Sequence, residues 1–281
     1  MNTKWLNARV THLMVGGLIA TASLTLVPVV AQAGQPCEAK SMTLMEMERG
    51  LELAVNTAQA LDQAKVKVAI IARVGQNLRE WGQRYSHIGL VYQPDQAHST
   101  RGPAKRAAWR VVHKLNECGS EKAHLYRQGL ADFFSDGLYE WEAAIVPLAP
   151  DLAGKVLALL NDKPAIPRMH ERAYNMLAYP WSIRYQQSNQ WVIETLASSA
   201  EPAIRQRSQA QAWLKFKGFQ PDRLKISAFK RLGARVTRAN VAFDDHPNAL
   251  RFSSRIDTTT ADSVLRWLRN SQLGQTKITV R

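Results

Sequence analysis

Apolar side chains alternate with polar or small ones in four segments of the chain, and this two-residue period is typical of β-strands. The segments are residues 65–73, 87–92, 109–115 and 141–146. The second begins with His87 and the third carries His113, and we expect these two consecutive strands to be antiparallel neighbours. The four segments together predict an antiparallel sheet.

A period of three to four residues predicts helices elsewhere. Thr43 and Glu46 have the spacing of a capping box, which predicts a helix from there to about residue 64. A helix over residues 188–200 is expected to begin at Ser188 or Asn189. The other predicted helices are residues 123–134, 151–160, 203–217 and 260–270, with a short helical turn at 76–81. The pattern predicts an α+β fold in which helices pack on an antiparallel sheet.

Residues 1–33 have the pattern of a secretory signal peptide. Basic residues precede an apolar run over residues 13–30, and Ala31-Gln32-Ala33 is a small-x-small cleavage site. The alternative is a helical membrane anchor, which the glycines and the proline within the run disfavour. We expect cleavage after Ala33 and a periplasmic or secreted protein, with no later segment long and apolar enough to span a bilayer.

Cys37 and Cys118 are the only two cysteines of the chain. In an exported protein an even pair favours a disulfide, which would stabilise the fold by roughly 2–4 kcal/mol. The alternative is a pair of buried thiols. Because the chain has no CxxC pair, we predict no metal site at the cysteines.

The formal net charge is +14, and basic residues are concentrated over residues 205–238. For an exported protein this composition favours contact with an anionic envelope component such as lipid or peptidoglycan. The alternative is a solvated helix face. Nucleic acid is not an expected partner, because no basic motif with interleaved aromatic residues is evident.

The candidate catalytic residues are His87, His113 and Ser188. A histidine with an ordinary pKa of about 6.5 can act as a base at neutral pH, and a second histidine can orient it. Ser188 stands at a predicted helix start, where the first-turn amides favour developing negative charge. The alternatives are an N-cap serine and hydrogen-bonded structural histidines. Common cofactor motifs (P-loop, GxGxxG) are absent, so we predict no cofactor.

Two further groups are candidates for a binding pocket. Asp244, Asp245 and His246 are consecutive and could supply acid and base groups, although an acidic turn before a proline is the alternative. Trp181 and Tyr185 lie close to Ser188 in sequence and could line a groove for a glycan, peptide or acyl chain, with core packing as the alternative.

The mature chain resembles a proteobacterial family catalogued as domain of unknown function 2145. The matching segments are residues 72–76, 84–87, 109–113, 185–191, 231–235 and 239–247. Within these segments Tyr85, Asn189 and Gln190 are neighbours of the candidate catalytic residues, and we expect them in the same pocket.

The order of these motifs also resembles the circularly permuted papain-like (NlpC-type) fold, whose layout lecithin retinol acyltransferase-like proteins share. In this resemblance His87 matches the catalytic histidine and His113 the orienting polar residue. Ser188 stands where the fold carries its catalytic cysteine. The resemblance implies a core over residues 34–200, with residues 201–281 as a basic helical extension packed on it.

Two functions follow from these patterns. The first is a hydrolase or acyltransferase that acts on amide or ester bonds of envelope components, with serine in place of cysteine. The second is a non-catalytic binding or assembly protein that uses the same pocket and a basic surface. Serine requires a base to take its proton, whereas cysteine ionises more readily beside a histidine. The chemistry of Ser188 therefore decides between the two.

Overall fold

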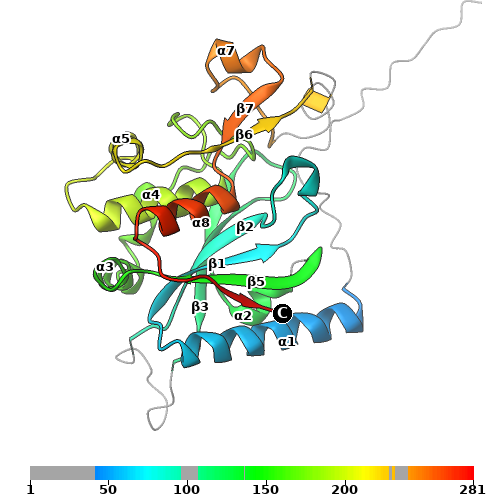
Figure 1. Cartoon of the computed structure of the whole chain (residues 1–281), viewed down its shortest axis with the longest axis vertical. Coiled ribbons are helices and arrows are strands. Elements are labelled where there is room, and N and C mark those ends of the chain that lie inside the picture. Colours follow the sequence, from blue (N-terminus) through cyan, green and yellow to red (C-terminus); the bar gives the residue numbers. More distant parts are fainter. Residues whose placement is uncertain (1–41, 96–106, 136, 228–229, 232–239) are drawn as a thin grey trace, which may run out of the picture. The chain divides into compact units, whose positions relative to one another are not determined.

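The main sheet has six strands in the order β4-β3-β2-β1-β5-β8, and every neighbouring pair is antiparallel (Figure 1). The computed structural model describes residues 42–95, 107–135, 137–227, 230–231 and 240–281. The strands are β1 (Val68–Val74), β2 (His87–Tyr92), β3 (Arg110–Asn116), β4 (Ala123–Gly129), β5 (Glu140–Pro147) and β8 (Ile278–Val280). With helices packed on this sheet, the predicted α+β fold is confirmed.

Helices cover both faces of the sheet. On one face, α3 (Pro150–Asn161), α4 (Ser188–Ala200) and α8 (Ala261–Asn270) share an apolar core with the even-numbered residues of β1 and β2. On the other face, α1 (Leu44–Gln63) and α2 (Leu130–Phe134) pack on the odd-numbered residues. All seven residues of β1 are therefore buried, as expected of a strand covered on both sides.

The capping box predicted at the start of α1 is present. The Thr43 hydroxyl accepts from the Glu46 amide at 3.2 Å, and a Glu46 carboxylate oxygen accepts from the Thr43 amide at 2.8 Å. The helix ends at Gln63, one residue before the predicted end. Local hydrogen-bonding chemistry thus determined this boundary.

The helix predicted over residues 123–134 is wrong for its first part. Residues Ala123–Gly129 form β4, which pairs with β3 from Arg110↔Gly129 to Asn116↔Ala123, and only Leu130–Phe134 is helical. The backbone NH and CO groups along one edge of β3 form hydrogen bonds with this segment over its whole length. Such tertiary pairing overrides a local helix preference.

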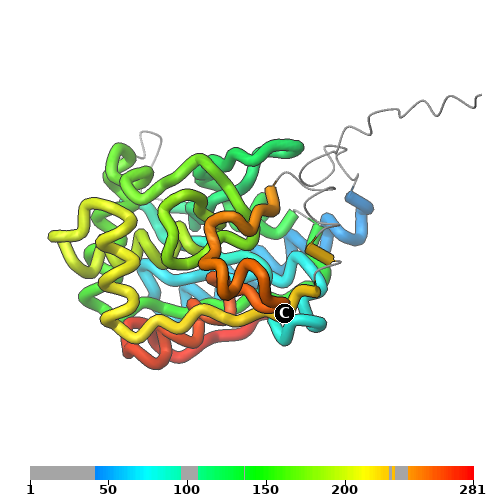
Figure 2. The backbone as a smooth tube through the Cα atoms, turned by 90° about the horizontal axis from the view of Figure 1, so that it is seen from above, coloured from blue at the N-terminus to red at the C-terminus, as the bar shows by residue number. Residues whose placement is uncertain are grey.

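A two-stranded sheet lies outside the main sheet and is formed by β6 (Asp222–Lys225) and β7 (Arg255–Thr258). The segment that contains β7 and the short α7 (Asn248–Arg251) crosses the middle of the view in Figure 2. Three further elements complete the described fold: the turns η1 (Arg79–Trp81) and η3 (Ile166–Met169), and the helix α5 (Arg207–Phe216). The small sheet carries an apolar cluster of its own.

Several predictions fall on residues that the structure does not describe. The signal peptide with its cleavage site, Cys37 and parts of the basic segment (residues 228–229 and 232–239) lie outside the described residues. Among the residues that the structure does describe, no helix combines the length and the hydropathy needed to cross a membrane.

Cys118 is disulfide-bonded, and Cys37 is the only other cysteine in the sequence. We predict that denatured but unreduced protein takes up no thiol-directed label, whereas reduced protein takes up two per chain, as counted by intact mass. Reduction is expected to lower the free energy of unfolding by roughly 2–4 kcal/mol. Two labelled thiols without prior reduction would contradict the predicted bridge.

Candidate functional site

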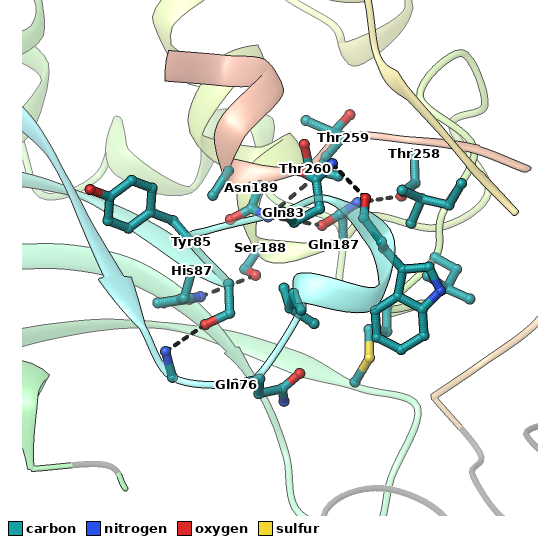
Figure 3. Close-up of a pocket in the computed structure, with 18 of the residues that line it drawn as sticks. Gln76, Gln83, Tyr85, His87, Gln187, Ser188, Asn189, Thr258, Thr259 and Thr260 are labelled. Carbon is teal, nitrogen blue, oxygen red and sulfur yellow. Dashed lines mark hydrogen bonds between the residues drawn. The ribbon is translucent and has the colours of Figure 1, made fainter. Parts of the chain in front are cut away.

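Four side chains form a continuous hydrogen-bonded relay that begins at the start of α4 and crosses three strands. His87 Nδ1 lies 3.3 Å from Ser188 Oγ, and His87 Nε2 lies 2.9 Å from His113 Nδ1. His113 Nε2 lies 2.7 Å from Gln128 Oε1. Figure 3 shows the first of these contacts, with His87 and Ser188 pointing toward one another. The structure thus brings together the three predicted catalytic residues and adds Gln128, which the sequence prediction did not include.

Gly89 is the reason that His113 can reach His87. Continuing the register from Leu90↔Val112 by one residue places His113 opposite Gly89. A Cβ atom at Gly89 would lie 3.1 Å from the His113 Cβ and 2.7 Å from a methyl of Val111. A residue other than glycine at position 89 would therefore collide with the side chains of β3, including that of His113. A glycine inside a strand marks such close approaches, so this signal could have been found in the sequence.

Phe133 of α2 covers the two imidazoles on the side of the sheet away from α4. Its ring centroid lies 5.9 Å from that of His87 and 5.2 Å from that of His113. Both histidines are buried, with exposed fractions of 8% and 1%. This packing limits rotation of the rings and keeps the hydrogen-bonded geometry in place.

The hydrogen bonds assign a direction to the relay. Because Gln128 Oε1 is an acceptor, His113 donates from Nε2 and its Nδ1 carries a lone pair. That lone pair accepts from His87 Nε2, which leaves His87 Nδ1 as an acceptor facing the Ser188 hydroxyl. The Tyr174 hydroxyl also bonds Ser188, while burial raises the pKa of Tyr174 to about 12. Ser188 therefore contacts both the phenol of Tyr174 and the acceptor nitrogen of His87.

Electrostatics keep His87 neutral. Burial lowers the pKa of His87 well below its ordinary value, and the charges of Arg73 and His113 act in the same direction. Arg73 is the direct cross-strand neighbour of His87 on β1. A neutral imidazole can accept a proton over a wide acid range, but the imidazolium that results gains no stabilisation from Arg73.

The N-terminus of α4 has no side-chain cap. Gln187 occupies the N-cap position, yet its amide donates to Thr258 Oγ1 at 2.7 Å instead of capping the helix. The Asn189 side chain accepts from the Ile88 amide at 3.2 Å and thereby fixes α4 to β2. The amides of the first turn have no intrahelical acceptors. They remain available to a negatively charged oxygen beside Ser188.

A cavity of about 440 Å³ opens at Ser188 and His87. It has a polar side and an apolar side, and none of the described residues that line it is acidic. The polar side is lined by Gln76, Gln83, Ser86, Gln187, Asn189, Thr258, Thr259 and Thr260, several of which appear in Figure 3. The apolar side is lined by Trp81, Met176, Leu177, Leu224, Ile226, Val241 and Phe243, which belong to the cluster of the small sheet. The cavity is therefore suited to a ligand with one polar and one apolar part.

Of the residues predicted for the binding pocket, Tyr85 and Asn189 line the cavity. The Tyr85 hydroxyl donates to Glu142 at 3.0 Å. The other predicted pocket residues are not among those that line it: Trp181, Tyr185, Gln190, Asp244, Asp245 and His246. Trp181 packs against Phe219 instead.

Asp244, Asp245 and His246 form local contacts. His246 Nδ1 lies 3.0 Å from an Asp245 carboxylate oxygen, and Asp244 pairs with Arg184 at 2.9 Å. The other Asp245 oxygen accepts from the Tyr179 amide at 2.8 Å. Across the described ranges, no cluster of three histidine, cysteine or acidic residues has the arrangement of a metal site.

A second buried network links α4 to β3 and α5. Glu194 is fully buried and accepts from Arg207 Nε at 2.7 Å, from Gln186 at 2.6 Å and from Gln211 at 2.8 Å. Lys114 of β3 donates to two oxygens of Gln186, at 2.8 and 2.9 Å, and burial lowers its pKa to about 6. The sequence prediction identified none of these buried groups.

Comparison with known proteins gives a family and no activity. No match was found among curated proteins or among solved structures. The family described as "Uncharacterized protein conserved in bacteria (DUF2145)" matches residues 60–268, a span that contains the whole relay and the residues that line the cavity. The chain belongs to this family.

Proposed function

We propose that this protein is an acyl hydrolase or acyltransferase of the permuted papain-like type, with Ser188 as nucleophile and His87 as base. The observation that carries the proposal is the contact of 3.3 Å between Ser188 Oγ and His87 Nδ1 at the wall of the cavity. This distance is within the reach expected of a nucleophile and its base in an empty site. The order of histidine strand, second histidine strand and nucleophile helix is the order of the papain-like resemblance.

The proposed reaction has two acyl-transfer steps. Ser188 Oγ attacks the carbonyl carbon of an amide or ester while its proton passes to His87 Nδ1, and the oxyanion is stabilised by first-turn amides of α4. His87 then returns the proton to the leaving amine or alcohol, which leaves an acyl ester on Ser188. Water or an acceptor alcohol or amine attacks that ester, with His87 again as base, and Ser188 is restored.

The proposed substrates are amides or esters of envelope components, lipid or peptidoglycan, in keeping with the predicted export signal. The apolar side of the cavity would hold an apolar group next to the scissile bond. The lack of acidic residues among the described lining residues suits an anionic or neutral substrate.

A second candidate function is non-catalytic binding of the same ligand class. The observation that favours it is the electrostatic setting of His87, where Arg73 opposes a protonated ring and a neutral amide ends the relay. In this case the cavity holds the ligand without cleaving it, and the basic surface meets an anionic envelope component. Sedimentation with anionic vesicles or peptidoglycan that is lost at high salt would support this function.

A pH profile of hydrolysis tests the enzymatic proposal. Substrates are p-nitrophenyl esters and the matching anilides, and Ser188→Ala is expected to lower kcat by at least about 10³-fold. Because the pKa of His87 lies well below its ordinary value, the base stays neutral as the pH falls. The wild-type rate should then stay level from pH 8 through pH 6.5 and decline only at lower pH. Equal rates for wild type and Ser188→Ala at every pH would leave only the binding function.

A further inference from the structure

We propose that Gln128 is the positioning residue that sets the direction of the proton relay, and so decides whether His87 faces Ser188 with a lone pair or with a hydrogen. The inference deepens the proposed function and rests on it, because a base is needed only if Ser188 is a nucleophile. Gln128 lies on β4, two strands away from His87, and touches the relay only through His113.

The two polar atoms of the Gln128 amide have opposite hydrogen-bonding roles, since Oε1 accepts and Nε2 donates. With Oε1 toward His113, each ring donates from Nε2 and accepts at Nδ1, so that His87 presents a lone pair to Ser188. If the amide turned by half a rotation, its NH₂ would donate to His113 Nε2. Both tautomers would then reverse, and His87 would donate a hydrogen to Ser188. The same four side chains would stay in contact, but Ser188 would have no base.

The groups around the relay do not replace Gln128 in this role. Arg73, the cross-strand neighbour of His87 on β1, lowers the pKa of His87 in either orientation. Phe133 of α2 and Tyr126 of β4 contact His113 through their rings. Asp132, in the helix that follows β4, accepts from the Gly129 amide at 3.1 Å. The amide of Gln128 is therefore the group whose orientation selects the tautomers.

Two substitutions of Gln128 distinguish its effect on the histidine tautomers from its contribution to side-chain packing. Gln128→Glu replaces the amide by a carboxylate that can only accept, so the tautomers should stay as in wild type and the base should become stronger. Gln128→Met keeps the length of the side chain and removes both polar atoms, so both tautomers of His113 and His87 become populated. We expect Gln128→Met to lower kcat by roughly 10–100-fold with little change in KM, and Gln128→Glu to keep wild-type kcat while the acid limb of the profile moves to higher pH. Gln59→Met, an exposed glutamine of α1, is the matched control.

The test is ¹⁵N NMR of the histidine rings in the full chain, together with kcat, KM and the pH profile. Wild type and Gln128→Glu should show His87 and His113 protonated at Nε2, and Gln128→Met should show mixed tautomers. Wild-type tautomers in Gln128→Met would overturn the inference. If Gln128→Met fails to fold, an unchanged pH profile in Gln128→Glu would overturn it. If tautomers respond as expected but no variant hydrolyses any substrate, the positioning role stands and the proposed function fails.

Discussion

Replacing Glu194 by alanine is expected to lower the free energy of unfolding by about 3–5 kcal/mol, the cost of removing one member of a buried ion pair. Glu194 has no exposed surface, and its carboxylate accepts hydrogen bonds from the guanidinium of Arg207 and from the amides of Gln186, Gln190 and Gln211. Alanine would leave these donors without this acceptor inside the protein.

The loss is large because the charge of Glu194 also acts on a second buried basic group. Lys114 is fully buried, and its pKa is lowered by desolvation and by Arg207 but raised by Glu194. Without the carboxylate, Arg207 would lose its buried ion-pair partner and the pKa of Lys114 would fall further. The helix that Glu194 stabilises is α4, whose first residue is Ser188, so the network stabilises the site as well as the core.

Urea unfolding of wild type and Glu194→Ala measures this effect. The midpoint should fall with no change in m-value, and the melting temperature should drop on the order of 10 °C. Glu201→Ala is the matched control, because Glu201 is exposed at the C-terminal end of the same helix. The control should stay within about 0.5 kcal/mol of wild type. A cost below about 1 kcal/mol for Glu194→Ala would show that the network does not hold α4.

The sequence predicted those parts of the fold that depend on residues close to one another in the chain. The capping box of α1 and the alternation over residues 87–92 are local patterns, and the structure confirms both elements. The same applies to the start of α4, because the polar residues Ser188 and Asn189 come before the apolar residues of the helix. Because His87 and Ser188 begin such elements, their positions could be predicted from the sequence.

The parts that were not predicted depend on contacts between distant segments. β4 forms because β3 offers it an edge, and the last strand β8 pairs with β5 across more than a hundred residues. The pair of Glu194 and Arg207 joins α4 and α5, and Gln128 meets His113 only through the register of β4. No local period indicates such partners.

The apolar side of the cavity was missed for the same reason. It is assembled from η1, from Met176 and Leu177 and from the small sheet, which are far apart in sequence. The prediction instead placed the nearby aromatic residues Trp181 and Tyr185 in the pocket. The structure packs Trp181 against Phe219 and places Tyr185 beside Asp244.

The second large effect that we predict is covalent modification of Ser188 that depends on His87. A fluorophosphonate should react when Ser188 Oγ attacks phosphorus, fluoride leaves and the hydroxyl proton passes to His87 Nδ1. Without its base the serine is a poor nucleophile. His87→Gln is therefore expected to slow labelling by about 10²–10⁴-fold, the usual contribution of a positioned base. Ser198→Ala, which alters another buried serine of α4, is the matched control and should label like wild type.

Intact-mass and peptide analysis after fluorophosphonate treatment shows whether Ser188 reacts as a nucleophile with His87 as its base. We expect one adduct per folded wild-type chain, located on Ser188, absent in Ser188→Ala and strongly slowed in His87→Gln. Folded wild-type protein that takes up no adduct, or His87→Gln protein that labels Ser188 at the wild-type rate, would contradict the claim that Ser188 and His87 form a nucleophile and its base.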